Sequence, residues 1–218
     1  MSSVDRKLLL LGGMSPGGRV FRQLAPLLQG GEMVPWIEPR DCKSIASYAR
    51  LLADSLDLDR PCDVLGISFG GIVAQELAAQ IGAGHCFVVS SISHPSELSR
   101  KTRLLGRLGP TTSDRLMCTA GRVAQGWPGR PSAATVRAQK LAGQDGSWYR
   151  WASAAAIRWK PHPDPSSSTV IRIHGDRDRT FPRGHLYADH VIAGAGHLLS
   201  VHHAAELAAI VEAHRAAT

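Results

Sequence analysis

Short apolar runs alternate with segments of helical periodicity along most of this chain, and that alternation constrains the fold more than any other feature. Lys7–Leu11 is apolar after its first residue, which is typical of a strand buried on both faces of a sheet. The predicted strands are Lys7–Leu11 and residues 33–37, 63–67, 86–89 and 169–173, with a short sixth within residues 186–192. The predicted helices cover residues 19–28, 45–56, 71–81 and 204–214. We therefore predict an α/β fold with about six mainly parallel strands and helices on both faces.

Residues 94–168 break this alternation with helical patterns that Gly109-Pro110 and Trp127-Pro128-Gly129 interrupt. The segment closes on a proline-rich stretch before residue 169. An insertion of this length inside a regular α/β alternation usually serves the function of the protein. We therefore predict a helical lid over residues 94–168, inserted into an α/β core made of residues 1–93 and 169–218.

The positive charge of the chain is concentrated in this insertion. The whole sequence carries a formal charge of +7, and residues 94–167 contain twelve Arg or Lys against four Asp or Glu. A solvated, arginine-rich helical surface explains such an excess, and attraction of an anionic substrate or partner is the alternative. Nucleic-acid binding is not expected, because no aromatic platform or recognisable binding motif accompanies the charge.

Composition and cysteine spacing narrow the class of protein further. Hydrophobic residues make up 44% of the chain and charged residues 20%, which is ordinary for a soluble globular enzyme. No apolar run approaches the ~20 residues that a bilayer span requires, and the leucine run at 8–11 is too short for a signal peptide, so we expect a cytoplasmic protein. The four cysteines have no metal-ligand spacing, and we expect buried thiols, no metal and no cofactor.

The pattern Gly66-Ile67-Ser68-Phe69-Gly70 lies between a predicted buried strand and a predicted helix. A G-x-S-x-G pentapeptide arises by chance, but in this context it is typical of a tight turn that exposes a nucleophilic serine hydroxyl. The following helix directs its N-terminal amides toward the place where negative charge develops. We predict Ser68 as a nucleophile; a glycine-rich turn without chemistry is the alternative.

A serine nucleophile needs a base and a group that orients the base. Among ten histidines, His197 follows a predicted strand and lies in the flexible sequence Ala193-Gly194-Ala195-Gly196 that could deliver an imidazole to the strand ends. A histidine in an ordinary connection is the alternative. Asp176 and Asp178 both follow the predicted strand at 169–173, and the residues alone leave the choice between them open.

With these residues in place, the sequence resembles the α/β-hydrolase superfamily across nearly all of its length outside the predicted lid. Ser68, an aspartate and His197 occur in the chain order of that superfamily. The segment His174-Gly175-Asp176-Arg177-Asp178 resembles its loop after the penultimate strand, and residues 194–197 resemble its histidine loop. The resemblance implies Asp178 as the acid of a Ser-His-Asp triad and Asp176 as a structural carboxylate.

The same resemblance implies an oxyanion hole made by the backbone N–H groups of Phe69 and Met14. The sequence departs from the superfamily in having Gly12-Gly13 where His-Gly is common, and we expect a compact sheet without the opening antiparallel strands of the superfamily. It is also similar to compact bacterial hydrolases with Arg-Val-Phe after the first loop and an aromatic helix closing the lid. Residues 19–21 and 148–159 match that description.

Trp148 and Trp151 lie near the end of the predicted lid and, with Ala155, form one stripe of a helix. Packing of the lid onto the core is one interpretation; an apolar wall for the acyl or aromatic part of a substrate is the other. We expect hydrolysis of a small-molecule carboxylic ester or thioester. The alternatives are C–C bond hydrolysis or lyase chemistry on the same triad, or a non-catalytic ligand-binding protein. The sequence leaves the oligomeric state open.

Overall fold

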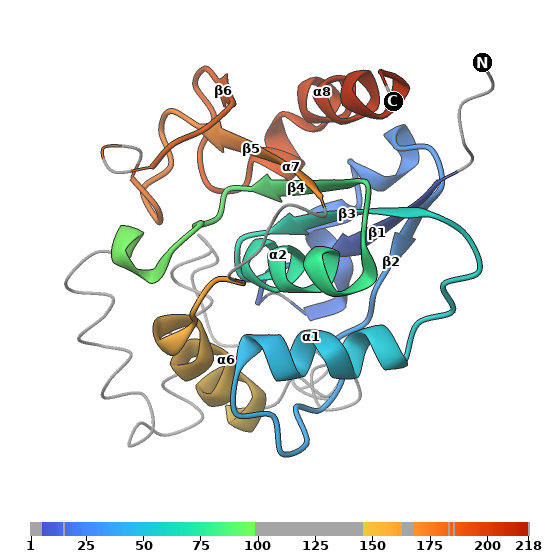
Figure 1. The fold of residues 1–218 in the computed structure, drawn as a ribbon. Helices are drawn as coiled ribbons and strands as arrows, with labels where there is room; N and C mark the ends of the chain where they lie inside the picture. The colour runs from blue at the N-terminus through green and yellow to red at the C-terminus, as the bar shows by residue number, and fades with distance from the viewer. Residues whose placement is uncertain are drawn as a thin grey trace.

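The computed structural model describes residues 6–14, 16–98, 146–162, 168–182, 184 and 186–217. These residues form one sheet of six strands in the order β2-β1-β3-β4-β5-β6, and every neighbouring pair is parallel (Figure 1). The strands are β1 (Lys7–Leu11), β2 (Gly31–Met33), β3 (Cys62–Ile67), β4 (His85–Val89), β5 (Thr169–Gly175) and β6 (His190–Ile192). The predicted parallel α/β fold is confirmed.

Helices cover both faces of the sheet (Figure 1). On one face lie α1 (Ile45–Asp54), α2 (Phe69–Ile81) and α6 (Gly146–Arg158), whose apolar residues share a core with Leu9 and Leu11. On the other face, the 3-10 turns η1 (Pro16–Phe21) and η2 (Ala25–Leu27) and helices α7 (Leu199–His202) and α8 (Ala204–Ala216) enclose Leu8 and Leu10. Successive leucines of β1 therefore enter opposite cores, which explains its continuous apolar sequence.

Two predicted elements differ from the structure. The second strand ends at Met33 rather than extending over residues 33–37, because Pro35 fixes its own φ and restricts the backbone of Val34 before it. Val34 N–H still donates to Leu10 O at 3.0 Å, and Trp36 beyond it packs into the core. The helix predicted over residues 19–28 is replaced by η1 and η2, because Pro26 interrupts helical hydrogen bonding. Most of the predicted lid lies outside the described residues; a short 3-10 turn, η3 (Pro95–Glu97), and α6 are its described elements.

A buried ionic group at the amino-terminal end of the strands ties α8 to the sheet. Asp63 on β3 has no exposed surface, and its Oδ1 accepts from the backbone N–H of His85 at 2.9 Å. Its Oδ2 accepts from Arg215 Nε at 3.1 Å, and the same guanidinium donates to the carbonyl of Arg6 at 2.8 Å.

None of the described helices is long and apolar enough to cross a membrane.

Beside this ionic group, the imidazoles of His190 and His214 meet with their Nε2 atoms 2.8 Å apart. Burial lowers the pKa of His214, His190 and His85 lower it further, and Asp189 opposes them. The folded protein therefore disfavours the charged form of His214, and near pH 6 it binds fewer protons here than the unfolded chain does.

We predict that this contribution to the free energy of unfolding is complete above the unfolded histidine pKa of about 6.5 and is lost as the pH falls through the lower folded value. Urea denaturation at about pH 7.5 and about pH 5.5 measures the loss. His190→Gln should make stability less dependent on pH, whereas His202→Gln, which changes an exposed imidazole, should not. Equal pH dependence in wild type and His190→Gln would contradict this assignment.

Candidate active site

Ser68 stands at the turn between β3 and α2 in a conformation that few non-glycine residues adopt. Its φ is 56° and its ψ is −120°. The turn is held by main-chain bonds from Ser68 N–H to Val89 O and from Gly71 N–H to Ser68 O, both at 2.9 Å. Ser91 Oγ also donates to Ser68 O at 2.6 Å. Such backbone strain persists only where the surrounding structure enforces it, and it is common at functional sites.

The glycines around Ser68 are required because three backbone segments pass through this point. A Cβ on Gly66 would lie 2.2 Å from Gly70 O, and a Cβ on Gly70 would lie 2.2 Å from Leu11 O. A Cβ on Gly71 would lie 2.5 Å from the Cβ of Ser91. The glycines predicted from the motif thus allow the end of β1, the turn and the start of α2 to pack against one another.

The structure brings His197 and Asp178 to Ser68 from two other loops. His197 Nε2 lies 3.0 Å from Ser68 Oγ, and His197 Nδ1 lies 2.8 Å from Asp178 Oδ2. Asp178 follows β5 and His197 follows β6, so both residues come from the carboxyl ends of parallel strands, where the loops of such sheets meet. The residues expected to form the triad are therefore in hydrogen-bonding contact.

Asp176 has a different place from Asp178. Its Oδ1 accepts the backbone N–H of Gly194 at 2.7 Å, and the next residue, Arg177, donates its N–H to Ala195 O at 2.9 Å. These two bonds join the loop after β5 to the loop that carries His197. Asp176 thus ties the two loops together, and Asp178 alone of the two carboxylates contacts His197.

The carboxylate of Asp178 is buried and receives four hydrogen-bond contacts. Its Oδ1 accepts the backbone N–H groups of Thr180 at 2.8 Å and Phe181 at 2.9 Å. Its Oδ2 faces His197 and also lies 3.3 Å from His174 Nε2, which carries its proton because it also donates to Phe181 O at 2.9 Å. Burial alone would raise the pKa of Asp178, but hydrogen bonds from His174 and His197 and from Phe181 N–H hold that pKa well below its ordinary value. Asp178 is therefore ionised at neutral pH and can stabilise a positive charge on His197.

Two backbone segments beside Ser68 hold the groups expected to form the oxyanion hole. Phe69 is the first residue of α2, and the first N–H groups of a helix have no carbonyl partner within it. The loop after β1 runs along the serine: a Cβ on Gly13 would lie 3.4 Å from Ser68 Cβ and 3.9 Å from Ser68 Oγ. Met14, the residue expected to supply the second N–H, follows directly.

Two aromatic residues that sequence reasoning did not assign to the site bind this loop. Trp36 Nε1 donates to Gly13 O at 3.1 Å, and the Tyr149 hydroxyl donates to Met14 O. Trp36 follows the end of β2, and Tyr149 lies on α6. Trp36 carries no motif, and although Tyr149 lies in the aromatic stretch at residues 148–159, nothing in the sequence assigns its hydroxyl to this loop.

Trp148 and Trp151 occupy different environments on α6. Trp148 has no exposed surface and packs against Trp36 and Phe69 with ring centroids 5.6 and 5.5 Å apart. Its burial favours the packing interpretation over an apolar wall for substrate. Trp151 is half-buried, and its Nε1 donates to Cys42 O at 2.6 Å.

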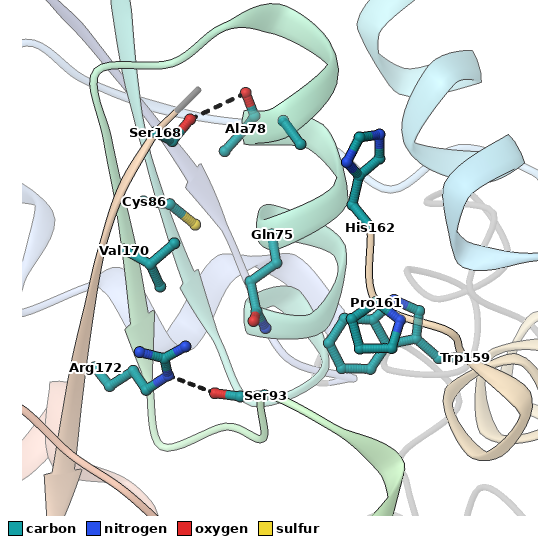
Figure 2. Close-up of a pocket in the computed structure, with 11 residues that line it drawn as sticks. Gln75, Ala78, Cys86, Ser93, Trp159, Pro161, His162, Ser168, Val170 and Arg172 are labelled. Carbon is teal, nitrogen blue, oxygen red and sulfur yellow. Dashed lines mark hydrogen bonds between the residues drawn. The ribbon is translucent and has the colours of Figure 1, made fainter. Parts of the chain in front are cut away.

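A cavity of about 110 Å³ is lined by residues of α2, β4 and β5 (Figure 2). It is bounded by Gln75 of α2, Cys86 of β4, Arg172 of β5 and the segment that follows α6, including Trp159. On its wall, Arg172 Nε donates to Ser93 Oγ at 2.6 Å. Ser68, His197 and Asp178 do not line it. Among the described residues, no three His, Cys, Asp or Glu side chains are grouped to hold a metal ion.

We predict that Gly70→Ala destabilises the protein by at least about 2 kcal/mol, because its methyl group would overlap two main-chain carbonyls. Gly184→Ala is the matched control, since a Cβ there meets no atom within 4 Å. Thermal and urea denaturation of both variants measure the difference. Equal stability of the two variants would show that the contact at Gly70 is not restrictive.

Comparisons with known proteins agree with this architecture. The model of the alpha/beta hydrolase family matches residues 8–210. A search of curated proteins finds no match. An esterase from Exiguobacterium antarcticum is similar in structure, with 14% identity, a TM-score of 0.66 and coverage of 98% of this chain and 93% of that chain.

Two thioesterases are also similar in structure. The RedJ thioesterase of the prodiginine biosynthetic pathway in Streptomyces coelicolor is 17% identical with a TM-score of 0.63. The match covers 96% of this chain and 90% of that chain. The NocB thioesterase domain, solved as a covalent complex with a fluorophosphonate nocardicin G analogue, is 19% identical with a TM-score of 0.61. The match covers 96% of this chain and 94% of that chain. At these identities the likeness concerns the fold, and the match of the family model over nearly the whole chain shows that this protein belongs to the alpha/beta hydrolase family.

Proposed function

We propose that this protein hydrolyses a carboxylic ester or thioester through a covalent acyl intermediate on Ser68. The observation that carries the proposal is the continuous contact from Asp178 Oδ2 to His197 Nδ1 and from His197 Nε2 to Ser68 Oγ. A hydroxyl is a weak nucleophile at neutral pH and needs an adjacent base, which this contact supplies. Membership of a hydrolase family and the structural likeness to esterases and thioesterases support the same reaction class.

The geometry suggests one sequence of proton transfers. His197 Nδ1–H donates to the ionised Asp178, which leaves Nε2 free to accept the Ser68 proton as Oγ attacks the substrate carbonyl. The oxyanion of the tetrahedral intermediate accepts hydrogen bonds from the backbone N–H groups of Phe69 and Met14. His197 then protonates the leaving alcohol or thiol, and the acyl group stays on Ser68. Water, deprotonated by His197, releases the acid and restores the serine.

In this proposal the insertion at residues 94–168 forms the lid over the substrate, and its basic residues attract an anionic group near the entrance. Trp151 is its candidate apolar contact for the substrate. The proposed substrate is a small-molecule ester or thioester, and the reaction requires no cofactor.

A fluorophosphonate probe tests the nucleophile. We expect the wild-type protein to be labelled at Ser68, and Ser68→Ala to lose labelling and at least about a thousandfold of its turnover of p-nitrophenyl butyrate. Ser153→Ala, which changes a serine of α6, is the control and should retain both. Folded wild-type protein that resists the probe would overturn the proposed mechanism, and a ligand co-purifying with such protein would favour a non-catalytic binding role.

The two aspartates of the loop after β5 separate orientation of the base from loop structure. Asp178→Asn should lower kcat by about a thousandfold or more, because an amide cannot stabilise the charged imidazole or hold its tautomer. Asp176→Asn keeps an oxygen that can accept from Gly194 and should lower kcat by less than about tenfold. Steady-state kinetics on both variants at neutral pH decide this. A larger loss of kcat in Asp176→Asn than in Asp178→Asn would show that Asp178 is not the residue that orients His197.

The bond that is cleaved is tested by comparing matched substrates. Oxygen esters, N-acetylcysteamine thioesters and a diketone that present the same acyl group should be assayed with wild type and Ser68→Ala. Turnover of either ester class that depends on Ser68 supports the proposal. Cleavage of the diketone alone would replace it with C–C bond hydrolysis.

A further inference from the structure

We infer that Trp36 and Tyr149 are positioning residues of the oxyanion hole, which together set the direction of the Met14 N–H. The inference rests on the proposed function and extends it to residues outside the triad. It also gives Tyr149, on the helix that ends the proposed lid, a positioning role at the site. Two carbonyl groups flank the Cα of Met14, and each accepts a hydrogen bond from one of these two side chains.

Trp36 holds the peptide group that contains the Met14 N–H. Its indole N–H donates to Gly13 O at 3.1 Å in a buried position. This peptide is trans, so the Gly13 carbonyl and the Met14 N–H lie in one plane and point in opposite directions. Anchoring the carbonyl on Trp36 therefore directs the N–H away from the indole and prevents rotation of the peptide plane.

Tyr149 holds the next peptide group in the same way. Its hydroxyl donates to Met14 O, across 135 positions of sequence. With both flanking carbonyls engaged, the two peptide planes on either side of the Met14 Cα are anchored. A glycine-rich loop has little conformational preference of its own, so these two side-chain donors supply the restraint that Gly12 and Gly13 do not.

Trp36 and Tyr149 belong, with Trp148, to an aromatic cluster that also supports Phe69, the other expected donor. Trp36 contacts the Phe69 ring at a centroid distance of 5.5 Å, and Trp148 contacts both of them. Tyr149 packs edge-on against Trp148 at 5.4 Å. The N–H groups of Phe69 and Met14 are therefore borne by segments that contact one packed cluster, which fixes their separation. Oxyanion stabilisation depends on such preorganised donors.

Conservative variants separate this role from simple packing. Tyr149→Phe and Trp36→Phe each remove one donor to the loop and keep an aromatic ring. Tyr48→Phe is the matched control for the first, because the Tyr48 hydroxyl donates at 2.8 Å to the carbonyl of Ile37, outside the loop. Trp159→Phe is the control for the second, because the Trp159 N–H donates at 2.7 Å to Glu76.

The readouts are kcat and KM for p-nitrophenyl butyrate, the second-order rate of fluorophosphonate labelling, and the Ki of a trifluoromethyl ketone. We expect Tyr149→Phe and Trp36→Phe each to lower kcat by about tenfold, less than the loss for deleting a donor, with KM changed by less than about twofold. The labelling rate should fall and the Ki rise by the same factor, because both depend on the oxyanion site. The two control variants should lose thermal stability but keep the kcat, labelling rate and Ki of the wild type.

Each outcome has a separate meaning. If the wild-type protein is labelled at Ser68 but Tyr149→Phe and Trp36→Phe match wild type in kcat, the positioning role is overturned while the proposed function stands. If the controls lose kcat and inhibitor affinity equally, general loosening of the cluster explains the effect and the positioning role is again overturned. If wild type itself is not labelled, the proposed function fails.

Discussion

The close passage of the β1 end against Gly70 is the constraint on which the rest of the site depends. Carbonyl oxygens of Leu11 and Gly12 occupy the space that a side chain at Gly70 would fill. Because the segments meet without intervening side chains, the start of α2 and the loop after β1 both lie beside Ser68. The strained backbone of Ser68 is a consequence of this packing, and its free-energy cost is borne by the buried sheet on either side of the turn.

Parallel strands then deliver the remaining groups to one place. β5 and β6 end at the same edge of the sheet as β3, and the loops that follow them are joined by Asp176. The carboxylate that contacts His197 is buried yet ionised, because main-chain N–H groups and His174 satisfy the lone pairs that His197 does not. The arrangement resembles a charged group solvated by protein dipoles rather than by water.

The sequence predicted the features that depend on local pattern and could not predict those that depend on distant packing. Strand β1 and helix α2 follow from continuous apolar character and from the motif around Ser68, and the structure confirms the parallel sheet. The predicted extents of the second strand and of the helix over residues 19–28 were wrong, because the backbone restrictions of Pro35 and Pro26 outweigh apolar periodicity there. Asp178 could be chosen over Asp176 from the family resemblance but not from charge or spacing. The bonds of Trp36 and Tyr149 to the loop after β1 have no local signal in the sequence, because they exist only in the folded chain.

The buried carboxylate of Asp63 has a consequence for the order in which the chain can become stable during synthesis. Its guanidinium partner, Arg215, is added 152 residues after it, and His197 is added 129 residues after the serine it contacts. A nascent chain that already contains β1, β3 and β4 can pair Asp63 Oδ1 with Arg6 and His85, but Asp63 Oδ2 lacks its guanidinium donor until α8 has been made. Compaction of the sheet is therefore tied to long-range contacts with α8, and a topology rich in such contacts is associated with slow folding. Ser68 is made long before His197, so the contact between them can form only after β4, β5 and β6 have been made.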